Sequence, residues 1–343
     1  KAGIEAHCDK FERMERVLKK LPIPEQGLFV APTVIKLEGI QELEQEIFGP
    51  VLHVATFEAD EIDQVVDTIN AQGYGLTFGL HTRVDSRVER IINRVKVGNI
   101  YVNRNQIGAI VGSQPFGGEG LSGTGPKAGG PQYVRRFMKS ETPHNAAVSA
   151  APTVTLERLQ MAIDQLQDYG WADPVDRAAR LKPVFGTVAA ALDAAPEAMP
   201  GPTGEINSLS CCPRGVVLCL GPDKTSALAQ AGIALSQGNA VVAVAPGIEA
   251  AVAAAVGEGI PVVGIDGLVI ADALAAAKGI EAVASAAGEP SLRAYRLALS
   301  KREGALLPLI TEQHAAERFV TERHLCVDTT AAGGNASLIA ASE

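Results

Sequence analysis

Hydrophobic positions along the chain alternate between short continuous runs and longer stretches with helical spacing. In the first part of the chain, apolar runs predict strands at Leu28–Val30, Val51–Phe57 and Asn99–Val102. Charged stretches with helical periodicity predict helices over Glu61–Gln72 and Ser86–Val95. Strands separated by helices are typical of an α/β layer with a mostly parallel sheet. The pattern therefore predicts the α/β fold class.

The alternation becomes more regular after Pro213. The runs GVVLCLG, NAVVAVAP and PVVGID predict buried strands, and the Ala-rich stretches TSALAQAGIALSQG and IEAAVAAAVGE predict helices between them. Small side chains let helices pack closely on both faces of a sheet, as a doubly wound fold requires. We therefore expect a Rossmann-like domain in this part of the chain.

Changes of pattern suggest where the parts of the chain begin and end. The periodic pattern of hydrophobic positions is lost after residue 140. A stretch with helical spacing follows, and prolines interrupt it. The last residues indicate an extended strand, a turn at Gly333-Gly334 and a short tail. We predict five parts: residues 1–140, a linker at 141–155, a helical segment at 156–205, the Rossmann-like domain at 206–320, and a strand with a tail motif at 321–343.

Composition narrows the classes of function. The 343 residues carry 30 Lys+Arg against 39 Asp+Glu, for a net charge of −9, and no basic run exceeds a pair. This charge pattern argues against nucleic-acid binding. The N-terminal KAGIEAHCDKFERMERVLKK is a charged amphipathic segment and is unlike a signal peptide. Five cysteines without CxxC spacing indicate reduced thiols, so we expect a cytoplasmic protein.

Glu46 and Phe48 form the first candidate site, within the segment EIFGPVL. A carboxylate just before a turn can accept hydrogen bonds from both hydroxyls of a ribose, and an aromatic ring can flank a planar nicotinamide. The alternative interpretation is a solvent-exposed Glu at a helix end followed by a core Phe.

Glycine density marks the second candidate, FGGEGLSGTGPKAGGP at Phe116–Pro131. Glycines allow backbone N–H groups to converge on an anion such as a carboxylate or a phosphate. The segment matches neither a P-loop nor the G-x-G-x-x-G pattern after a strand. A structural loop is the alternative interpretation.

The cysteines and histidines give no clear nucleophile or metal site. Cys219 lies in an apolar run and is expected in the core, while Cys211-Cys212 precede a strand entry. Cys8 follows His7 on a helical segment, and nothing in the sequence orients that pair. The six histidines lack the spacing of metal ligands. We therefore expect neither a catalytic residue nor a metal ion in this chain.

Four segments together resemble the aldehyde dehydrogenase superfamily. EIFGPVLHVATF, YGLTFGLHTR, VGNIYVNRN and QPFGGEGLSGTGPKAGGP occur in this order and look like the C-terminal third of its catalytic unit. The amino-acid sequence of these segments resembles that of the glutamate-semialdehyde (1-pyrroline-5-carboxylate) dehydrogenase domain in the bacterial proline utilization A family. GPTGEIN and VDTTAAGGNASL resemble segments that follow this domain in the longer members. The resemblance thus implies the C-terminal part of such a long protein, with a second aldehyde-dehydrogenase-like domain.

The resemblance assigns roles to five residues. It implies that Glu46 holds the nicotinamide ribose of NAD and that Phe48 lies beside the nicotinamide. Gly129 and Gly130 match glycines whose N–H groups bind the α-carboxylate of the substrate, and Phe137 matches an aromatic that packs on its aliphatic part. The family's catalytic Cys, oxyanion Asn and general-base Glu have no counterpart here, so we expect the chain alone to be inactive.

The second domain departs from the family at its cofactor-binding positions. The family's second strand ends in Lys-Pro, where this chain has Val244-Ala245, and GPDKTS replaces a segment with Trp-Asn. Loss of the Lys removes a donor to the adenosine ribose. We therefore expect a non-catalytic domain that covers an internal cavity and stabilises a homodimer.

The leading functional expectation follows from the resemblance. An upstream FAD-dependent domain oxidises proline, and the product passes as L-glutamate γ-semialdehyde to the NAD-dependent dehydrogenase, which forms L-glutamate. The alternative is a non-catalytic truncated scaffold or dimerisation module without a nucleophile. A regulatory NAD sensor built on the second domain is disfavoured by Val244.

Overall fold

The computed structural model describes residues 1–138, 151–167, 169, 173–193 and 195–330. Most of the expected linker at 141–155 lies outside these residues, as does the part after residue 330 of the strand and tail motif expected at 321–343. Contacts between residues divide the chain into a first unit, residues 1–74 with 86–96, and a second unit, residues 75–85 with 97–343. This division differs from the boundary at residue 140, because strands late in the chain pair with strands that precede it.

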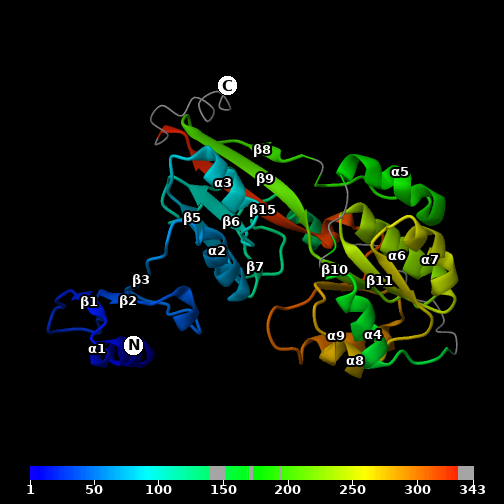
Figure 1. Ribbon diagram of the computed structural model, residues 1–343, viewed down its shortest axis with the longest axis horizontal. Coiled ribbons are helices and arrows are strands. Elements are labelled where there is room, and N and C mark those ends of the chain that lie inside the picture. Colours follow the sequence, from blue (N-terminus) through cyan, green and yellow to red (C-terminus); the bar gives the residue numbers. More distant parts are fainter. Residues whose placement is uncertain (139–150, 168, 170–172, 194, 331–343) are drawn as a thin grey trace. The chain divides into compact units, whose positions relative to one another are not determined.

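The first unit contains a small three-stranded sheet and a helix (Figure 1). The strands β1 (Val17–Lys20), β2 (Thr33–Lys36) and β3 (Val51–Val54) lie in that order, with β1 antiparallel and β3 parallel to β2. The N-terminal helix α1 (Ala2–Arg13) contributes Cys8 and Phe11 to a core with Ile35 and Leu37 of the sheet.

Two strand predictions in this unit are wrong in part. Leu28–Val30 is not a strand but belongs to the connection between β1 and β2, and Leu28 is 90% exposed. Pro32 follows and has no N–H to donate, so regular pairing begins only at Thr33. The strand expected at Val51–Phe57 ends at Val54. Short apolar runs are thus weak evidence for strands where no second layer buries them.

Two helices complete the first unit and match the predicted positions closely. They are α2 (Ile62–Ala71) and α3 (Asp85–Ile92), and a short 3-10 helix η1 (Ile40–Glu42) precedes them. Three ion pairs join α2 to α3 and the residues just after it, namely Arg90–Asp63, Arg94–Asp63 and Arg94–Asp67. All four side chains of these pairs are at least 31% exposed, so we expect each pair to contribute little stability.

A mixed sheet in the second unit gathers strands from distant parts of the chain (Figure 1). Its central strand β15 (Val320–Asp328) is parallel to β6 (Asn99–Val102) on one side and antiparallel to β9 (Glu205–Pro213) on the other. β5 (Thr77–Leu80) and β8 (Glu197–Met199) form the edges. The segment expected to be helical thus ends in a strand, because β8 pairs with β9.

Two-residue strands and short helices frame the loop after β6. β4 (Tyr74–Gly75) lies where the two units meet along the chain, and β7 (Glu119–Gly120) lies in the glycine-rich segment. The 3-10 helices η2 (Val134–Phe137) and η3 (Ala316–Phe319) follow that segment and precede β15, respectively.

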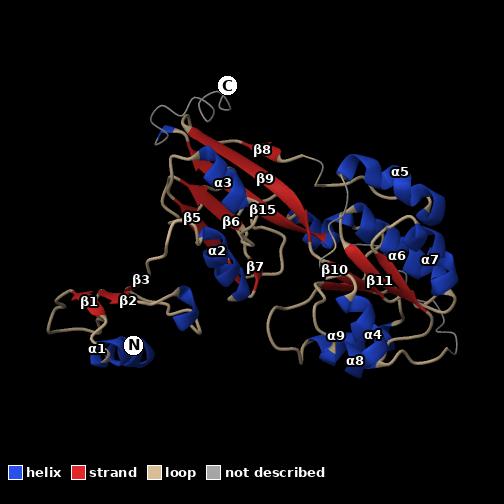
Figure 2. Cartoon of the chain, in the orientation of Figure 1, coloured by secondary structure: helices blue, strands red, loops and turns tan. Residues whose placement is uncertain are grey.

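A parallel five-stranded sheet confirms the Rossmann-like prediction (Figure 2). Helices lie on both faces, and apolar side chains that alternate along the strands form one core on each face. Val242 and Leu218 face one core, whereas Val241 and Val217 face the other. The strands in spatial order are β12 (Val262–Ile265), β11 (Ala240–Val244), β10 (Val216–Cys219), β13 (Ala282–Ala284) and β14 (Leu309–Ile310).

Several helices of this domain begin with a residue whose side chain caps the helix N-terminus. Asp223, for example, accepts a hydrogen bond from the N–H of Ser226 at 3.0 Å. One face of the sheet packs against helices α4, α8 and α9, and the other against α5, α6 and α7. Their bounds are α4 (Leu156–Asp164), α5 (Pro174–Phe185), α6 (Lys224–Ser236), α7 (Ile248–Gly257), α8 (Ala271–Ala276) and α9 (Glu289–Leu299).

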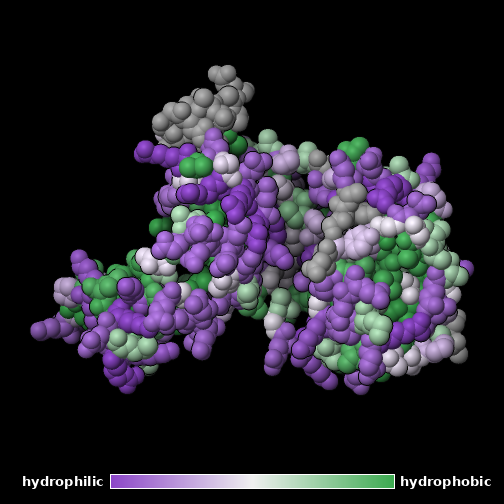
Figure 3. Space-filling model, viewed as in Figure 1, coloured by the Kyte–Doolittle hydropathy of each residue, from purple (hydrophilic) through white to green (hydrophobic). Residues whose placement is uncertain are grey.

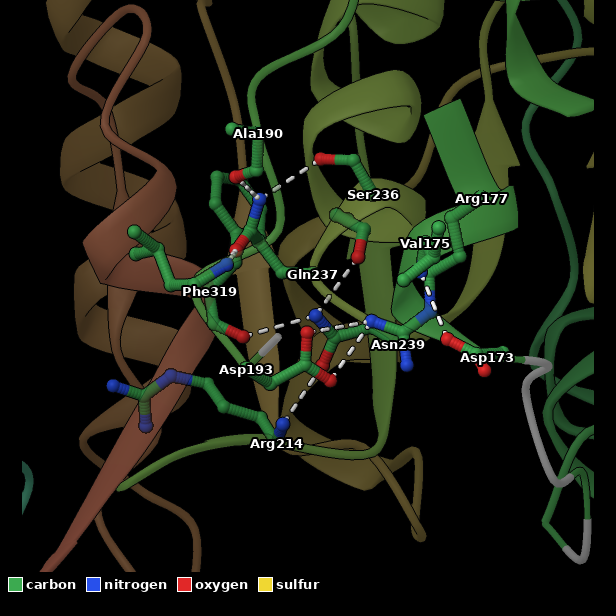
Figure 4. Close-up of polar contacts among 12 residues, drawn as sticks. Asp173, Val175, Arg177, Ala190, Asp193, Arg214, Ser236, Gln237, Asn239 and Phe319 are labelled. Carbon is green, nitrogen blue, oxygen red and sulfur yellow. Dashed lines mark hydrogen bonds and ion pairs between the residues drawn. The ribbon is translucent and has the colours of Figure 1, made fainter. Parts of the chain in front are cut away.

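A buried amide at the turn between α6 and β11 ties several segments together (Figure 4). The side chain of Asn239 accepts hydrogen bonds from the N–H groups of Arg214 and Gly215, at 2.8 and 3.2 Å. It donates to the carbonyls of Ala234 and Phe319, both at 2.9 Å. Phe319 immediately precedes β15, so this turn fixes the point at which the chain leaves the Rossmann-like domain and returns to the mixed sheet.

None of the helices among the described residues combines the length and the apolar character needed to cross a membrane.

Candidate active site

Glu46 and Phe48 lie in the first unit, on the irregular loop between η1 and β3. Phe48 is 88% exposed, so the interpretation of this residue as a core Phe is wrong. Glu46 is exposed as well, and its carboxylate has neither a hydrogen bond nor an ion pair with another described residue. The loop therefore presents a carboxylate and a ring to the outside, as a ribose and a planar heterocycle require.

The sheet of the first unit also exposes apolar side chains. A groove of about 440 Å³ runs over it, and apolar surface gathers over its first strands (Figure 3). Leu18, Leu28 and Leu52 are 59%, 90% and 59% exposed. The groove is lined by Lys19, Leu21, Pro32, Thr33, Val34, Gly49, Pro50, Val51 and Leu52.

The glycine-rich loop of the second unit is held in place along most of its length. Phe116 and Ala128 exchange two backbone hydrogen bonds of 3.0 and 2.8 Å, which close the loop at its base. The buried Asn99 at the start of β6 donates to the carbonyls of Leu76 and Gly117, at 3.0 and 3.2 Å. The loop is thus a fixed element of the second unit.

The two glycines expected to bind a carboxylate differ in their environment. Gly130 is buried, and its N–H donates to the carbonyl of Lys127 at 3.1 Å. Gly129 is exposed, has φ +73°, and has open space where a Cβ would lie. This left-handed conformation favours glycine. Of the pair, only Gly129 faces outward.

Phe137 follows on η2 and is 77% exposed. Its ring packs edge-on against Tyr133, with 5.5 Å between the ring centroids. Gly129, Gly130 and Phe137 thus belong to one continuous stretch of the second unit, whereas Glu46 and Phe48 belong to the first.

Lys127 is a buried residue of the loop that the sequence did not single out. It is 2% exposed, and its Nζ donates to Asn99 Oδ1 at 3.2 Å and to the carbonyl of Gly117. Burial lowers the pKa of Lys127 to about 8, against 10.5 ordinarily. A buried positive charge therefore lies within the loop at neutral pH. Its only sequence signal was a lone Lys amid glycines.

Glu322 on β15 is the second residue that sequence reasoning missed. Its Oε2 accepts a hydrogen bond from the backbone N–H of Lys127 at 2.7 Å. The residue is 9% exposed, and burial raises the pKa of its carboxyl group. The next residue, Arg323, donates to Glu119 Oε1 at 2.9 Å and to Oε2 at 3.4 Å. The last described strand thus contacts both ends of the glycine loop.

His324 extends this buried polar region along β15. The ring is fully buried and lies 6.4 Å, between centroids, from the ring of Tyr101 on β6. Burial lowers the pKa of His324 to about 4, with smaller contributions from the positive charges of Lys127 and Arg104. This histidine is therefore neutral at physiological pH.

The cysteines lack the environment of a catalytic nucleophile, which needs a lowered pKa. Burial raises the pKa of Cys211 to about 12 and also raises the pKa of Cys212, Cys219 and Cys326. These four thiols are protonated at neutral pH. Cys8 is buried in the core of the first unit.

His7 has a partner that the sequence did not reveal. Its Nε2 lies 2.8 Å from Nε2 of His53, so His53 orients one member of the His7–Cys8 pair. Burial lowers the pKa of both rings. Within the described part of the chain, no group of three or more His, Cys, Asp or Glu side chains is arranged to hold a metal ion.

Comparisons with known proteins identify what the chain is similar to. Residues 11–142 match the aldehyde dehydrogenase family. The chain is 37% identical over 332 residues to bifunctional protein PutA of Escherichia coli (strain K12). That alignment covers 92% of this chain and 24% of the Escherichia coli protein. It is 42% identical over 123 residues to 1-pyrroline-5-carboxylate dehydrogenase of Bacillus subtilis (strain 168), covering 35% of this chain and 24% of that enzyme.

A solved structure shares the fold over nearly the whole chain. Proline utilization A from Corynebacterium freiburgense superposes with a TM-score of 0.53 at 20% identity, over 91% of this chain and 29% of that one. The chain spans about a quarter of the length of the curated relatives it matches. Residues 11–142 thus resemble the aldehyde dehydrogenase family, and over most of its length the chain is similar to the bifunctional PutA proteins.

Proposed function

We propose that this chain forms part of an NAD-dependent dehydrogenase that oxidises L-glutamate γ-semialdehyde to L-glutamate. The observation that carries the proposal is the glycine loop, which is fixed at its base and presents Gly129 outward in a left-handed conformation. Similarity to the Bacillus subtilis 1-pyrroline-5-carboxylate dehydrogenase supports the choice of substrate.

The loop and the helix after it supply the substrate contacts in this proposal. The backbone N–H of Gly129 binds the α-carboxylate of the semialdehyde, and the ring of Phe137 packs on its methylene groups. Gly130 has a structural part, because its own N–H is used by the carbonyl of Lys127. The buried ammonium of Lys127, held at Asn99 and Gly117, adds positive charge to the loop that receives the anion.

Glu46 and Phe48 fit the nicotinamide half of NAD. An exposed carboxylate without a partner among the described residues has both oxygens available for the two ribose hydroxyls, and an exposed ring can lie against the nicotinamide. NAD supplies the acceptor for the hydride that leaves the aldehyde carbon. Overall, that carbon also gains one oxygen from water, two protons are released, and the carboxylate of glutamate forms.

The nucleophile of the reaction is proposed to come from protein outside these 343 residues. The raised pKa values of Cys211, Cys212, Cys219 and Cys326 support this, as does a chain that spans a quarter of its relatives. The exposed apolar groove on the β1–β3 sheet supports it too, since such surface is usually covered. FAD-dependent proline oxidation and transfer of the semialdehyde through an internal cavity belong to the same proposal.

A non-catalytic role is proposed for the Rossmann-like domain. The carboxylate of Asp223 occupies the N-terminus of α6, where a dinucleotide phosphate would otherwise bind. Val244 offers no donor to a ribose. The domain instead covers the cavity and stabilises a homodimer. In this proposal the tail after β15 shares that role. Deletion of residues 329–343 from the complete protein, which leaves β15 intact, is therefore expected to reduce both dimerisation and coupled conversion of proline to glutamate. Unchanged values would contradict this role.

Substitution of the two candidate contacts tests the dehydrogenase. In the complete protein, Glu46→Gln is expected to raise the KM for NAD, and Gly129→Ala the KM for the semialdehyde, in assays of NADH formation. Glu44→Gln, at an exposed neighbour, controls for charge. Gly304→Ala controls for backbone strain, because Gly304 has φ +88° and equally open surroundings. A complete protein that forms no NADH with the semialdehyde would instead support a scaffold.

A further inference from the structure

We propose that Glu322 and Arg323 of β15 are positioning residues that hold the glycine loop, and with it Gly129, in the form that binds the substrate carboxylate. The inference rests on the proposed function and assigns a part of the site to a strand that follows the Rossmann-like domain. Neither residue touches the substrate. Each acts through the loop.

The geometry of β15 explains why this strand reaches the loop. β6 begins at Asn99, which lies opposite His324. Glu322 and Arg323 precede His324 on β15, so they lie beyond the N-terminal end of β6. The N–H of His324 still bonds to the carbonyl of Gly98 at 2.8 Å. β9 pairs with β15 on the opposite side over its whole length. The glycine loop therefore meets β15 on the side that β6 leaves free.

Consecutive residues of a strand point to opposite faces of the sheet. Glu322 reaches the loop from one face and accepts the N–H of Lys127, while Arg323 reaches it from the other face and pairs with Glu119. The base of the loop is closed by the pairing of Phe116 with Ala128. β15 thus holds both ends of the segment between Glu119 and Lys127.

A short chain of contacts leads from Glu322 to Gly129. Both backbone groups of Lys127 are used, since its N–H donates to Glu322 and its carbonyl accepts from Gly130. A Cβ on Gly130 would lie 3.6 Å from Glu322 Oε1, which shows how closely the turn rests on this carboxylate. Gly129 lies between these two fixed residues. Loss of the acceptor at Glu322 would leave the buried N–H of Lys127 without a partner, which favours a shifted loop.

Charge gives Glu322 a second effect that substitutions can separate from the first. The carboxylate lies near the ammonium of Lys127, and the two interact electrostatically. Glu322→Gln removes the charge but keeps an oxygen that can accept the N–H of Lys127. Glu322→Ala removes both. The hydrogen bond is the part of this contact that positions the loop.

The experiment uses the complete protein and compares Glu322→Ala, Glu322→Gln and Arg323→Gln with the wild type. We expect Glu322→Ala to raise the KM for the semialdehyde about tenfold, which corresponds to loss of one buried hydrogen bond of about 1.4 kcal/mol. The KM for NAD is expected to stay unchanged. Arg323→Gln should have a smaller effect in the same direction, and Glu322→Gln should restore most of the wild-type KM.

Two further measurements separate positioning from a general loss of structure. Calorimetric titration with L-glutamate, the proposed product, should show weaker binding in Glu322→Ala. Hydrogen exchange at the N–H of Lys127 should be faster in that variant. Asp193→Asn is the matched control, because it breaks the buried ion pair with Arg177 in the Rossmann-like domain without touching the loop. It should lower stability and leave the KM for the semialdehyde unchanged.

The outcomes distinguish the inference from the function on which it rests. If the wild type oxidises the semialdehyde and Glu322→Ala leaves its KM and glutamate binding unchanged, the positioning role is wrong and the proposed function stands. Equal defects in Glu322→Gln and Glu322→Ala would also overturn it, since the Gln variant keeps the acceptor. If the wild type neither oxidises the semialdehyde nor binds glutamate, the proposed function fails.

Discussion

The two sheets of the second unit bury very different side chains. β10 and β11 of the parallel sheet contribute only Val, Leu, Ala and Cys to the interior. The mixed sheet buries Asn99, Glu322 and His324 on its two central strands, and Lys127 lies against it. Burial of ionisable groups lowers stability unless partners compensate. The comparison indicates that the parallel sheet serves stability, whereas the mixed sheet retains polar groups that act on the glycine loop.

The parallel sheet should be the more sensitive to loss of apolar volume. Leu218 is fully buried, and Leu218→Ala is expected to lower the free energy of unfolding by about 2–5 kcal/mol through lost burial and a cavity. Urea denaturation measures the change. Leu297→Ala, at a residue that is 56% exposed, provides the control. A loss below about 1 kcal/mol at Leu218 would mean that this core is loosely packed.

The turn at Asn239 tests the connection between the two sheets. Asn239→Ala removes four hydrogen bonds, one of them to the carbonyl of the buried Phe319, so we expect the free energy of unfolding to fall by about 2–3 kcal/mol. Asn105→Ala, at an exposed residue, is the control. Because the carbonyl of Phe319 is one of the partners, hydrogen exchange should also rise at the start of β15. Protection that stays at the wild-type level there would contradict the coupling of the two sheets.

The pH dependence of stability should reveal the polar interior of the mixed sheet. His324 has a pKa of about 4 in the folded chain against 6.5 ordinarily, because burial disfavours its charged form. Its neutral form is therefore favoured by folding, and stability is fully present above pH 6.5. Between pH 6.5 and 4 the unfolded chain takes up the proton first, which lowers stability by roughly 2–3 kcal/mol.

Glu322, Lys127, Arg104 and Tyr101 also face this region, so a substitution must isolate the histidine. The pH dependence of unfolding in His324→Phe, subtracted from that of the wild type, isolates the contribution of the ring. A difference that stays constant between pH 7 and 4 would refute it.

The smallest loss of stability is expected where an exposed ion pair is broken. Arg94 and Asp67 form a pair at 2.5 Å, with exposures of 44% and 55%. Asp67→Asn is expected to cost about 0.2–1 kcal/mol, and less at high salt, because solvent screens the interaction. Thermal unfolding in low and high salt checks this. A cost as large as that of Asn239→Ala would contradict the view that only buried polar groups are important here.

The parallel sheet was the easiest part to predict from sequence. Runs such as GVVLCLG are apolar at every position because both faces of β10 are buried, and the pattern therefore has one interpretation. The run at Leu28–Val30 has the same character over three residues, but no second layer covers it. Composition alone does not distinguish these two situations.

The sequence predicted only those site residues that belong to short local motifs. Glu46, Phe48, Gly129, Gly130 and Phe137 stand out through motifs within a few residues of each. That Gly130 is buried and Gly129 exposed depends on a turn that the glycine spacing leaves open. Glu322 and Lys127 meet because two segments 195 residues apart come together, and no period or spacing carries that information.

The placement of β15 also has a consequence for the order of events during folding. Arg104, just after β6, contacts Cys326 on β15, and 222 residues separate them. A sheet closed by such a distant strand forms slowly, because a long loop must be ordered first. During synthesis on the ribosome, the edge of β6 that pairs with β15 therefore stays unpaired until the Rossmann-like domain, which lies between the two strands in sequence, has been synthesised. Chaperones that shield unpaired strand edges should bind nascent chains in this interval and release them once β15 has emerged.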